Sequence, residues 1–340
     1  MTNPINEGAN STFIMAAEET EGLSLGKIVW GRFVRHKAAM LSAIVFVLTV
    51  LLVLTSIGVG PIPGWWIWSP TDIDPTIVNN GHPTLAWEGL WFTLGEHPFG
   101  QDQIGRDVFA RTMRGAQVSL MVMVLMGLIA TAVGVVIGAV AGFYRGRTDN
   151  VLMRITEVFI AIPTIVVTAV IGHKFGASNP AVFGIVLGFL LWPGLARLVR
   201  ADYLTLRERE FVDAARVAGA GDRTIMFKHI LPNAIGVVIV NATLLMATAT
   251  ILEAALSFLG FGIQAPNVSL GNLINEYQTS FSTRPWLFWW PGFFIIVFAL
   301  TINLIGDGLR DAFDPRQRRI PKTKELSKQA VVKAEREVAE

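Results

Sequence analysis

The chain has 340 residues, of which 52% are hydrophobic and 16% charged, and its mean hydropathy is +0.51. Soluble domains are closer to a quarter charged, so much of this surface must face something other than water. The net charge of +2 is too small to indicate a nucleic-acid-binding protein, and the lack of cysteine excludes disulfides, thiolate metal sites and cysteine nucleophiles.

The N-terminal 60 residues divide into a polar segment, a basic segment and a membrane span. Residues 1–24 are polar and mildly acidic, which predicts a disordered N-terminus without a cleaved leader. Segment 24–37 places Trp30 and Phe33 among basic residues. This pattern favours an amphipathic helix in the lipid headgroup layer, leading into the first transmembrane helix within 25–60. The alternative is a solvated basic flank.

Six stretches are long and apolar enough to cross a membrane as helices, and no sustained alternation suggests a barrel. The sequence therefore predicts an all-α membrane protein with six transmembrane helices. A long loop, 61–115, separates the first helix from a core of five more helices at 116–310, and a charged tail follows at 311–340. The six stretches are 38–60, 116–143, 154–173, 180–199, 233–258 and 287–307.

Basic residues gather at alternate ends of these spans, which sets the orientation. They precede the first span and fill the connections after the second, fourth and sixth spans. Both termini are therefore expected in the cytoplasm and loop 61–115 outside. Three basic residues in that outer loop conflict with this orientation: Arg106, Arg111 and Arg114. Asp102 and Asp107 lie close to them in the sequence.

The outer loop contains a compact charged block. Asp102, Arg106 and Asp107 alternate in charge beside Gly100 and Gly105. This predicts a tight loop held by ion pairs. Such a loop either caps a pore or meets a binding protein, or it is a self-satisfied structural loop.

Small and polar residues stand out inside the spans. Gly134, Gly138 and Gly142 recur every four residues, a spacing that lets helices pack closely. Pro163 and Pro193 predict kinks, either fixed bends or hinges. Polar residues within spans suggest function by default. Asn241, Glu253 and Asn303 are candidates for lining a pathway. For the two asparagines the alternative is an interhelical hydrogen bond. For Glu253, and also for Glu157, the alternative is a carboxylate at the membrane interface.

The polar segment 202–232, between the fourth and fifth spans, predicts a helix, a glycine break and a second helix. Gly219 and Gly221 interrupt the first helix, and Asp222 is a plausible N-cap of the next. Pro232 opens the fifth span, where its missing N–H costs little. The result is an elbow in the cytoplasm, whose small side chains permit close docking of another protein.

This elbow resembles the EAA loop of ATP-binding-cassette (ABC) importer permeases. Ala214, Ala215, Gly219, Leu231 and Pro232 match the motif in register, Asp213 replaces its Glu, and His229 fits the form usual in peptide permeases. In that family the loop forms a coupling helix that sits in a cleft of the ATPase subunit. The resemblance implies the same role here.

Other blocks are similar to the C-type subunit of the peptide permease branch (dipeptide, oligopeptide and nickel), which has the type I importer fold. These blocks are 97–108, 115–120, 253–260 and 303–316, so the resemblance covers roughly residues 25–320. Leu270 stands where the family often has Trp, and the sequence of loop 61–95 differs from that of the family. The resemblance implies a multi-pass protein of a prokaryotic cell membrane, in contact with lipid.

The implied function is import of di- or oligopeptides by alternating access. The implied partners are a second homologous permease forming a heterodimer, two ABC ATPase subunits and an extracytoplasmic substrate-binding protein. No Walker A motif, zincin helix or nucleophile elbow occurs, so we expect no catalysis by this chain. It is expected to bind no cofactor or metal, with ATP and Mg²⁺ on the ATPases.

Several alternatives remain open at this point. Within the branch, nickel chelates, glutathione and glycosides are other cargoes. An ion-driven secondary transporter acting through Glu157 or Glu253 predicts uptake independent of ATP. An intramembrane enzyme requires paired catalytic groups, which the sequence does not offer.

Overall fold

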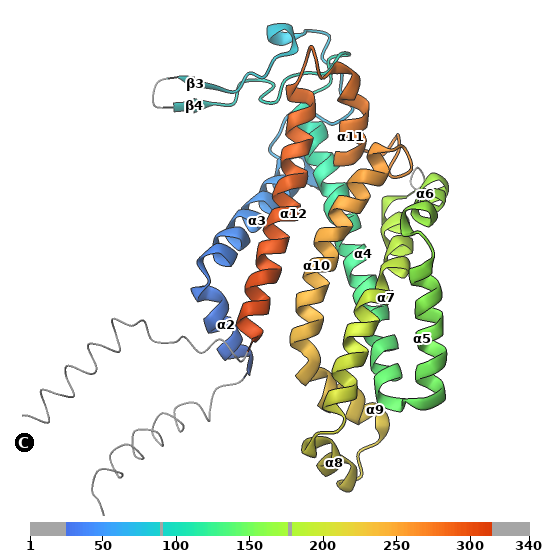
Figure 1. Cartoon of the computed structure of the whole chain (residues 1–340). Coiled ribbons are helices and arrows are strands. Elements are labelled where there is room, and N and C mark those ends of the chain that lie inside the picture. The colour runs from blue at the N-terminus through green and yellow to red at the C-terminus, as the bar shows by residue number, and fades with distance from the viewer. Residues whose placement is uncertain (1–24, 89–90, 176–178, 315–340) are drawn as a thin grey trace, which may run out of the picture.

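The computed structural model describes residues 25–88, 91–175 and 179–314. The predicted disordered segment 1–24 and most of the predicted tail lie outside these residues. Described tail residues 311–313 continue the last helix instead of forming an extension. Long helices dominate and stand side by side as a bundle (Figure 1). Five are long and apolar enough to cross a membrane, and a bent pair, counted as one, makes six.

The first two helices form a corner at one end of the bundle. Helix α2 (Leu25–Arg35) is the predicted amphipathic helix, with Phe33 buried and Trp30 65% exposed. Helix α3 (Lys37–Ser56) crosses the bundle beside α12 (Figure 1). It ends four residues before the predicted boundary, where β1 (Gly58–Val59) pairs with β2 (Ile62–Pro63) in a short hairpin. The side chain of Arg32 donates to the carbonyls of Ala312 and Asp314, which fixes α2 to the end of α12.

The centre of the bundle is α4 (Val108–Tyr144) packed along α7 (Pro180–Leu206). Helix α4 starts eight residues earlier than predicted, because the carboxylate of Asp107 accepts the N–H of Ala110 and caps it there. The predicted glycine stripe faces α7. A Cβ placed on Gly138 would lie 2.5 Å from the carbonyl oxygen of Ala196, so only glycine allows this approach.

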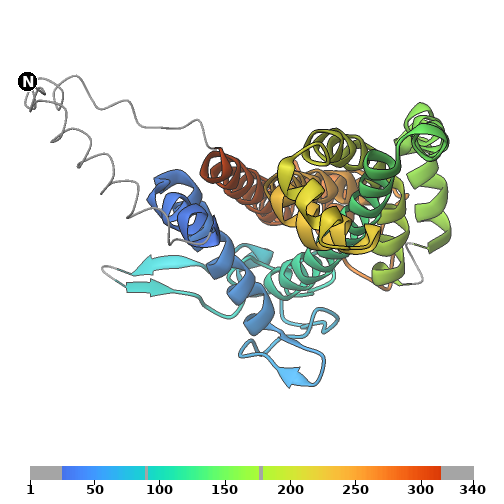
Figure 2. The same cartoon turned by 90° about the horizontal axis from the view of Figure 1, so that it is seen from below.

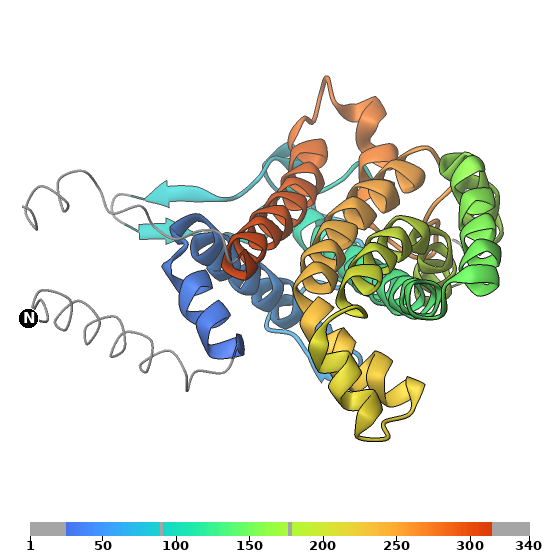
Figure 3. The same cartoon turned by 60° about the horizontal axis from the view of Figure 1, so that its bottom comes forward.

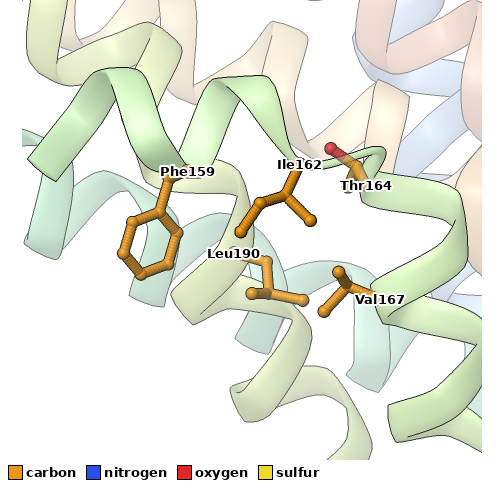
Figure 4. Close-up of a pocket in the computed structure, with 5 residues that line it drawn as sticks. All are labelled: Phe159, Ile162, Thr164, Val167 and Leu190. Atoms are coloured by element: carbon orange, nitrogen blue, oxygen red, sulfur yellow. The ribbon is translucent and has the colours of Figure 1, made fainter.

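The third predicted span is broken rather than continuous. Helices α5 (Gly146–Ala161) and α6 (Thr164–Phe175) meet at 75° across Ile162 and Pro163. Proline cannot donate the hydrogen bond that would continue α5, so the predicted kink is a complete break. A small pocket of about 40 Å³, partly open to the surface, lies beside the break and is lined by Phe159, Ile162, Thr164, Val167 and Leu190 (Figure 4). Pro193, by contrast, lies inside an unbroken α7.

The last two spans complete the bundle on its other side. Helices α10 (Leu231–Phe258) and α12 (Trp286–Phe313) pack against each other, and α12 also covers α3. The short helix α11 (Leu270–Tyr277) lies between them at one end, and η3 (Gln278–Ser280) follows it. At that same end the loop before α4 carries the short 3₁₀ helix η1 (Val78–Gly81) and the hairpin of β3 (Ala86–Glu88) and β4 (Trp91–Thr93), which extends away from the bundle (Figure 1).

Candidate functional site

The sequence-predicted residues gather in three places: an elbow at one end of the bundle, a charged cap at the opposite end, and single positions within the spans. The elbow comprises α8 (Glu210–Val217), α9 (Asp222–Thr224) and the π-helical turn η2 (Ile225–Ile230). It projects beyond the bundle, as Figures 1 and 3 show from two directions. Seen from that end, the elbow overlies α10, α7 and α4 (Figure 2).

The base of the elbow is firmly attached to the spans. Val212 and Ala215 on α8 share a buried apolar cluster with Ile225 and Met226 of η2 and with Tyr203 of α7. The Tyr203 hydroxyl donates to the carbonyl of Met226 at 3.0 Å. Since the inner face of α8 is buried in this cluster, and η2 is hydrogen-bonded to α7 and continues into α10, the elbow is expected to move with α7 and α10.

The outer face of the elbow is open. Val217 is 91% exposed, and Phe211 and Phe227 are also exposed. Asp213 and Ala214 are exposed as well, and Asp213 pairs with Arg216 at 3.5 Å. The outer face of the elbow thus combines exposed apolar and charged side chains, in contrast to the buried inner face of α8.

The glycine break lies between α8 and α9, and its first glycine has a left-handed backbone conformation. Gly219 has a φ of +81°, a left-handed conformation that residues with a Cβ rarely adopt, and it follows the last turn of α8. Gly221, with a φ of −72°, is the N-cap of α9, so the prediction that Asp222 fills this position is wrong by one residue. Pro232 lies in the first turn of α10, as predicted, and α10 begins one residue earlier at Leu231. The side-chain amide of Asn233 donates to the His229 carbonyl.

The charged cap is formed by two groups of side chains. In the first, His97 is 1% exposed at its side chain and contacts two carboxylates. Its Nδ1 lies 2.7 Å from Asp107 and its Nε2 lies 3.4 Å from Asp74. The Trp66 indole N–H donates to Asp107, and the ring of Trp68 lies against that of His97. These two tryptophans therefore belong to the cap.

In the second group, two arginines hold two carboxylates. Arg106 contacts Asp102 at 2.6 Å and Glu276 at 2.5 Å. Arg111 contacts Glu276 at 2.5 Å, and its Nε is buried without a hydrogen-bond partner. Burial lowers the pKa of Arg106, but the charge of Asp102 and its hydrogen bonds outweigh this and raise the pKa overall. The expected ion pair of Asp102 with Arg106 is present, whereas Asp107 contacts His97 and, within the described residues, no arginine. Arg106 and Arg111, two of the three arginines that conflicted with the orientation, are paired with carboxylates.

Tight turns bring these groups together. Gly100 and Gly105 have φ values of +84° and +89°, and a Cβ on Gly105 would lie 2.2 Å from the carbonyl oxygen of Asp74. The sequence pattern did not identify Glu276 or Asp74 as partners, because they lie 170 and 23 residues from Arg106 and His97 respectively. An alternation of charges within one loop carries no signal about such distant partners.

The four polar positions within the predicted spans differ in their surroundings. The side-chain amides of Asn241 and Asn303 each donate to a carbonyl one turn earlier in their own helix. Glu253 is 1% exposed and hydrogen-bonded to serines. It is therefore not on an open surface of this chain. Glu157 is exposed and pairs with Arg154, as an interfacial carboxylate would. Among the described residues, no group of His, Asp and Glu has the arrangement of a metal site.

The protonation of His97 gives the cap a predicted pH dependence. Burial lowers its pKa, but the hydrogen bond and charge of Asp107, aided by Asp74, outweigh burial and leave the pKa above its ordinary value. A raised pKa stabilises the folded state fully below about pH 6.5 and loses that contribution as the pH rises through the folded-state pKa. We expect the melting temperature of the wild type to exceed that of His97→Gln most at about pH 6 and by less at higher pH. A difference independent of pH would contradict this.

Two protein-family models match this chain, and their matches include helices at its N-terminal end and the elbow. The family model described as "Binding-protein-dependent transport system inner membrane component" matches residues 134–319. A second, described as "N-terminal TM domain of oligopeptide transport permease C", matches residues 24–83. The first match includes the elbow, and the second includes α2 and α3.

Several relatives are similar over most of their length. The oligopeptide transport system permease protein OppC of Haemophilus influenzae is 35% identical over 323 residues, 93% of this chain and 98% of the relative. OppC of Mycobacterium tuberculosis is 34% identical over 301 residues, 88% and 97% of the two chains. Among solved structures, an inward-facing MetNI methionine ABC transporter chain aligns with 59% of this chain and 95% of its own, at a TM-score of 0.47 and 20% identity.

Proposed function

This chain belongs to the family of binding-protein-dependent transport system inner membrane components, and on that premise we propose that it is the permease subunit of a peptide importer. It is a multi-pass protein of the inner membrane, with apolar helices that fit such an environment. The driving ATPase activity resides in separate subunits, which bind ATP and Mg²⁺. The observation that carries the proposal is the elbow, which projects from the bundle with an exposed apolar tip.

The orientation follows from the basic residues at the elbow end. Helix α2, the α4–α5 junction, the elbow and the end of α12 all lie at that end, and all carry Lys or Arg. The positive-inside rule places this end, with both termini, in the cytoplasm. The charged cap then faces outward, where an extracytoplasmic binding protein delivers cargo.

The elbow is the contact with an ATPase subunit. Its outer face presents Phe211, Asp213 and Val217, while the inner face of α8 is buried against α7 and η2. When a partner displaces this face, α7 and α10 are therefore expected to move with it. Since a partner shifts a conformational equilibrium only by binding the two states differently, the elbow must be bound differently by the ATP-bound and nucleotide-free ATPases.

Transport then proceeds by alternating access. A second, homologous permease completes the pathway as a heterodimer with this chain. ATP-driven closure of the two ATPase subunits draws the two elbows together and opens the pathway to the outside. Hydrolysis resets the pathway toward the cytoplasm.

The proposed cargo is di- and oligopeptides. The relatives in Haemophilus influenzae and Mycobacterium tuberculosis are named as oligopeptide permeases, and each aligns over nearly its whole length. Uptake of labelled peptides by the complex, in competition with glutathione, nickel chelates and glycosides, tests this assignment. If the complex preferred one of the competitors, that compound and not peptide would be assigned as the cargo.

A cross-linking experiment tests the elbow contact. Because the chain has no cysteine, Val217→Cys provides a single attachment site for a photoreactive thiol reagent at the tip of the elbow. We expect irradiation of the native membrane complex to link this chain to an ATPase subunit. Ile104→Cys, 54% exposed at the opposite end, is the matched control and should give no such product. An ATPase-containing complex that links from neither site, or equally from both, would contradict the assignment.

A further inference from the structure

A buried carboxyl group, Glu253, lies near the end of α10 that faces the charged cap. Two serine hydroxyls donate to it at 2.8 Å, Ser119 from α4 and Ser257 one turn further along α10. Ser269, the N-cap residue of α11, contributes a third side-chain hydrogen bond. One carboxyl group thus joins two spans and the start of α11.

The same serines also bind the backbone of the segment that leads into α11. Ser119 accepts the N–H of Leu270 at 3.3 Å, and Ser257 accepts the N–H of Ile263 at 3.0 Å. Close packing supports these bonds, since a Cβ on Gly271 would lie 2.3 Å from the carbonyl oxygen of Ala254. The beginning of α11 is therefore held against α4 and α10 by contacts centred on Glu253.

The other end of α11 belongs to the charged cap. Glu276 contacts Arg106 and Arg111, each at 2.5 Å, and the buried ring of Tyr277 lies beneath the Arg111 guanidinium. Helix α11 therefore bridges the Glu253 cluster and the loop that forms the outer surface of the cap.

The opposite end of α10 continues into the elbow. Helix α9, the turn η2 and α10 form one helical run from Asp222 to Phe258. Glu253 is five residues from one end of this run, and the elbow is at the other. The elbow and the hydrogen-bonded group around Glu253 are thus joined by one continuous helical run.

We propose that Glu253 is a positioning residue that fixes α11 to α10, so that movement of the elbow reaches the charged cap. The role rests on the proposed function, because it assigns a path to the coupling between ATPase and external opening. It differs from the pathway-lining role predicted for Glu253 from the sequence. The residue acts on the cap through the serines and α11 and does not touch cargo.

Glu253 performs this role as a neutral acid. Within the described part of the chain no Lys, Arg or His pairs with it, and it is 1% exposed inside a membrane span. A buried carboxylate without a cation is strongly disfavoured, whereas a protonated carboxyl group both donates and accepts hydrogen bonds among hydroxyls. Glutamine has nearly the same shape and cannot ionise, so Glu253→Gln is expected to preserve the positioning role.

The test follows the position of α11 in the intact complex. Gln278→Cys places a thiol just beyond α11 at an exposed position, in a chain without other cysteines. Its labelling rate with a membrane-impermeant maleimide is measured with and without ATP. We expect an ATP-dependent change in rate in this parent and in Glu253→Gln, and loss of that change in Glu253→Ala. The same complexes are checked for assembly by size-exclusion chromatography.

A milder variant covers the case in which Glu253→Ala fails to fold. Ser119→Ala removes one hydrogen bond to Glu253 and one to the α11 segment, and should reduce the ATP-dependent change. Ser56→Ala is the matched control and should retain it, because among the described residues the hydroxyl of this buried serine donates only to the Val53 carbonyl within α3. A full ATP response in assembled Glu253→Ala or Ser119→Ala, or its loss in assembled Glu253→Gln, overturns the proposal. Failure of the parent itself to respond would instead count against the proposed function.

Discussion

Replacing Gly219 with valine is expected to abolish most ATP-driven uptake while leaving the protein inserted and assembled. Gly219 has a φ of +81° at the exposed end of α8, where nothing crowds a side chain. The cost of valine is therefore backbone strain, on the order of 1–3 kcal/mol for a residue outside its allowed region. The elbow relieves that strain by changing the angle between α8 and α9, which alters the surface offered to the ATPase. ATP hydrolysis should continue, uncoupled from transport.

Gly221→Val is the matched control for this prediction. Gly221 is two residues away, equally open, and has φ and ψ values of −72° and 158°, an extended conformation that valine adopts readily. We expect its uptake to remain close to that of the wild type. Uptake and ATP hydrolysis are measured together in proteoliposomes containing the whole complex. Normal uptake by Gly219→Val would refute the coupling role of the elbow.

Replacing Gly138 with valine is expected to prevent normal packing of α4 against α7. The new Cβ would lie 2.5 Å from the Ala196 carbonyl oxygen and 2.8 Å from the Val199 Cβ, and the carbonyl belongs to a helix backbone that cannot rotate away. Overpacking commonly costs about 1–3 kcal/mol, and a contact with backbone lies at the upper end of that range. Thermal unfolding in detergent should show a clearly lower melting temperature or little folded protein.

Gly194→Val provides the comparison for Gly138. Gly194 lies in α7, the helix against which Gly138 packs, and no atom lies within 4 Å of a Cβ placed there. Both variants place a β-branched residue in a helix, so only the contact differs. Equal melting temperatures for the two variants would show that the small-residue stripe does not set the α4–α7 distance.

Much of the fold is predictable from composition and local pattern. The span positions follow from runs of apolar residues, and the elbow from its glycines and Pro232. The break in the third span could not be predicted in this way, because hydropathy measures how apolar a segment is and not the direction in which the chain runs. Ile162 and Pro163 lie within an apolar run, yet the run is bent by 75°. The early start of α4 depends on the cap supplied by Asp107, which lies in a polar loop that hydropathy excludes from a span.

The candidate sites are less predictable, because they depend on residues far apart in the chain. The sequence indicates Asp102 and Arg106 as an ion pair, but not Glu276, which is 170 residues from Arg106. Glu253 is conspicuous as an acid within a span, and its local sequence favours a pathway or an interface. Its partner Ser119 is 134 residues away, and only the tertiary structure brings the two together.

The most direct test of the central claim is to purify this chain gently from its native membrane and identify what accompanies it by mass spectrometry. We predict a second, homologous permease and ATPase subunits with Walker motifs, with the binding protein recovered when the complex is cross-linked. Recovery of the chain alone, or only with copies of itself, from a preparation shown to keep known complexes intact would contradict an importer subunit and favour a self-contained transporter.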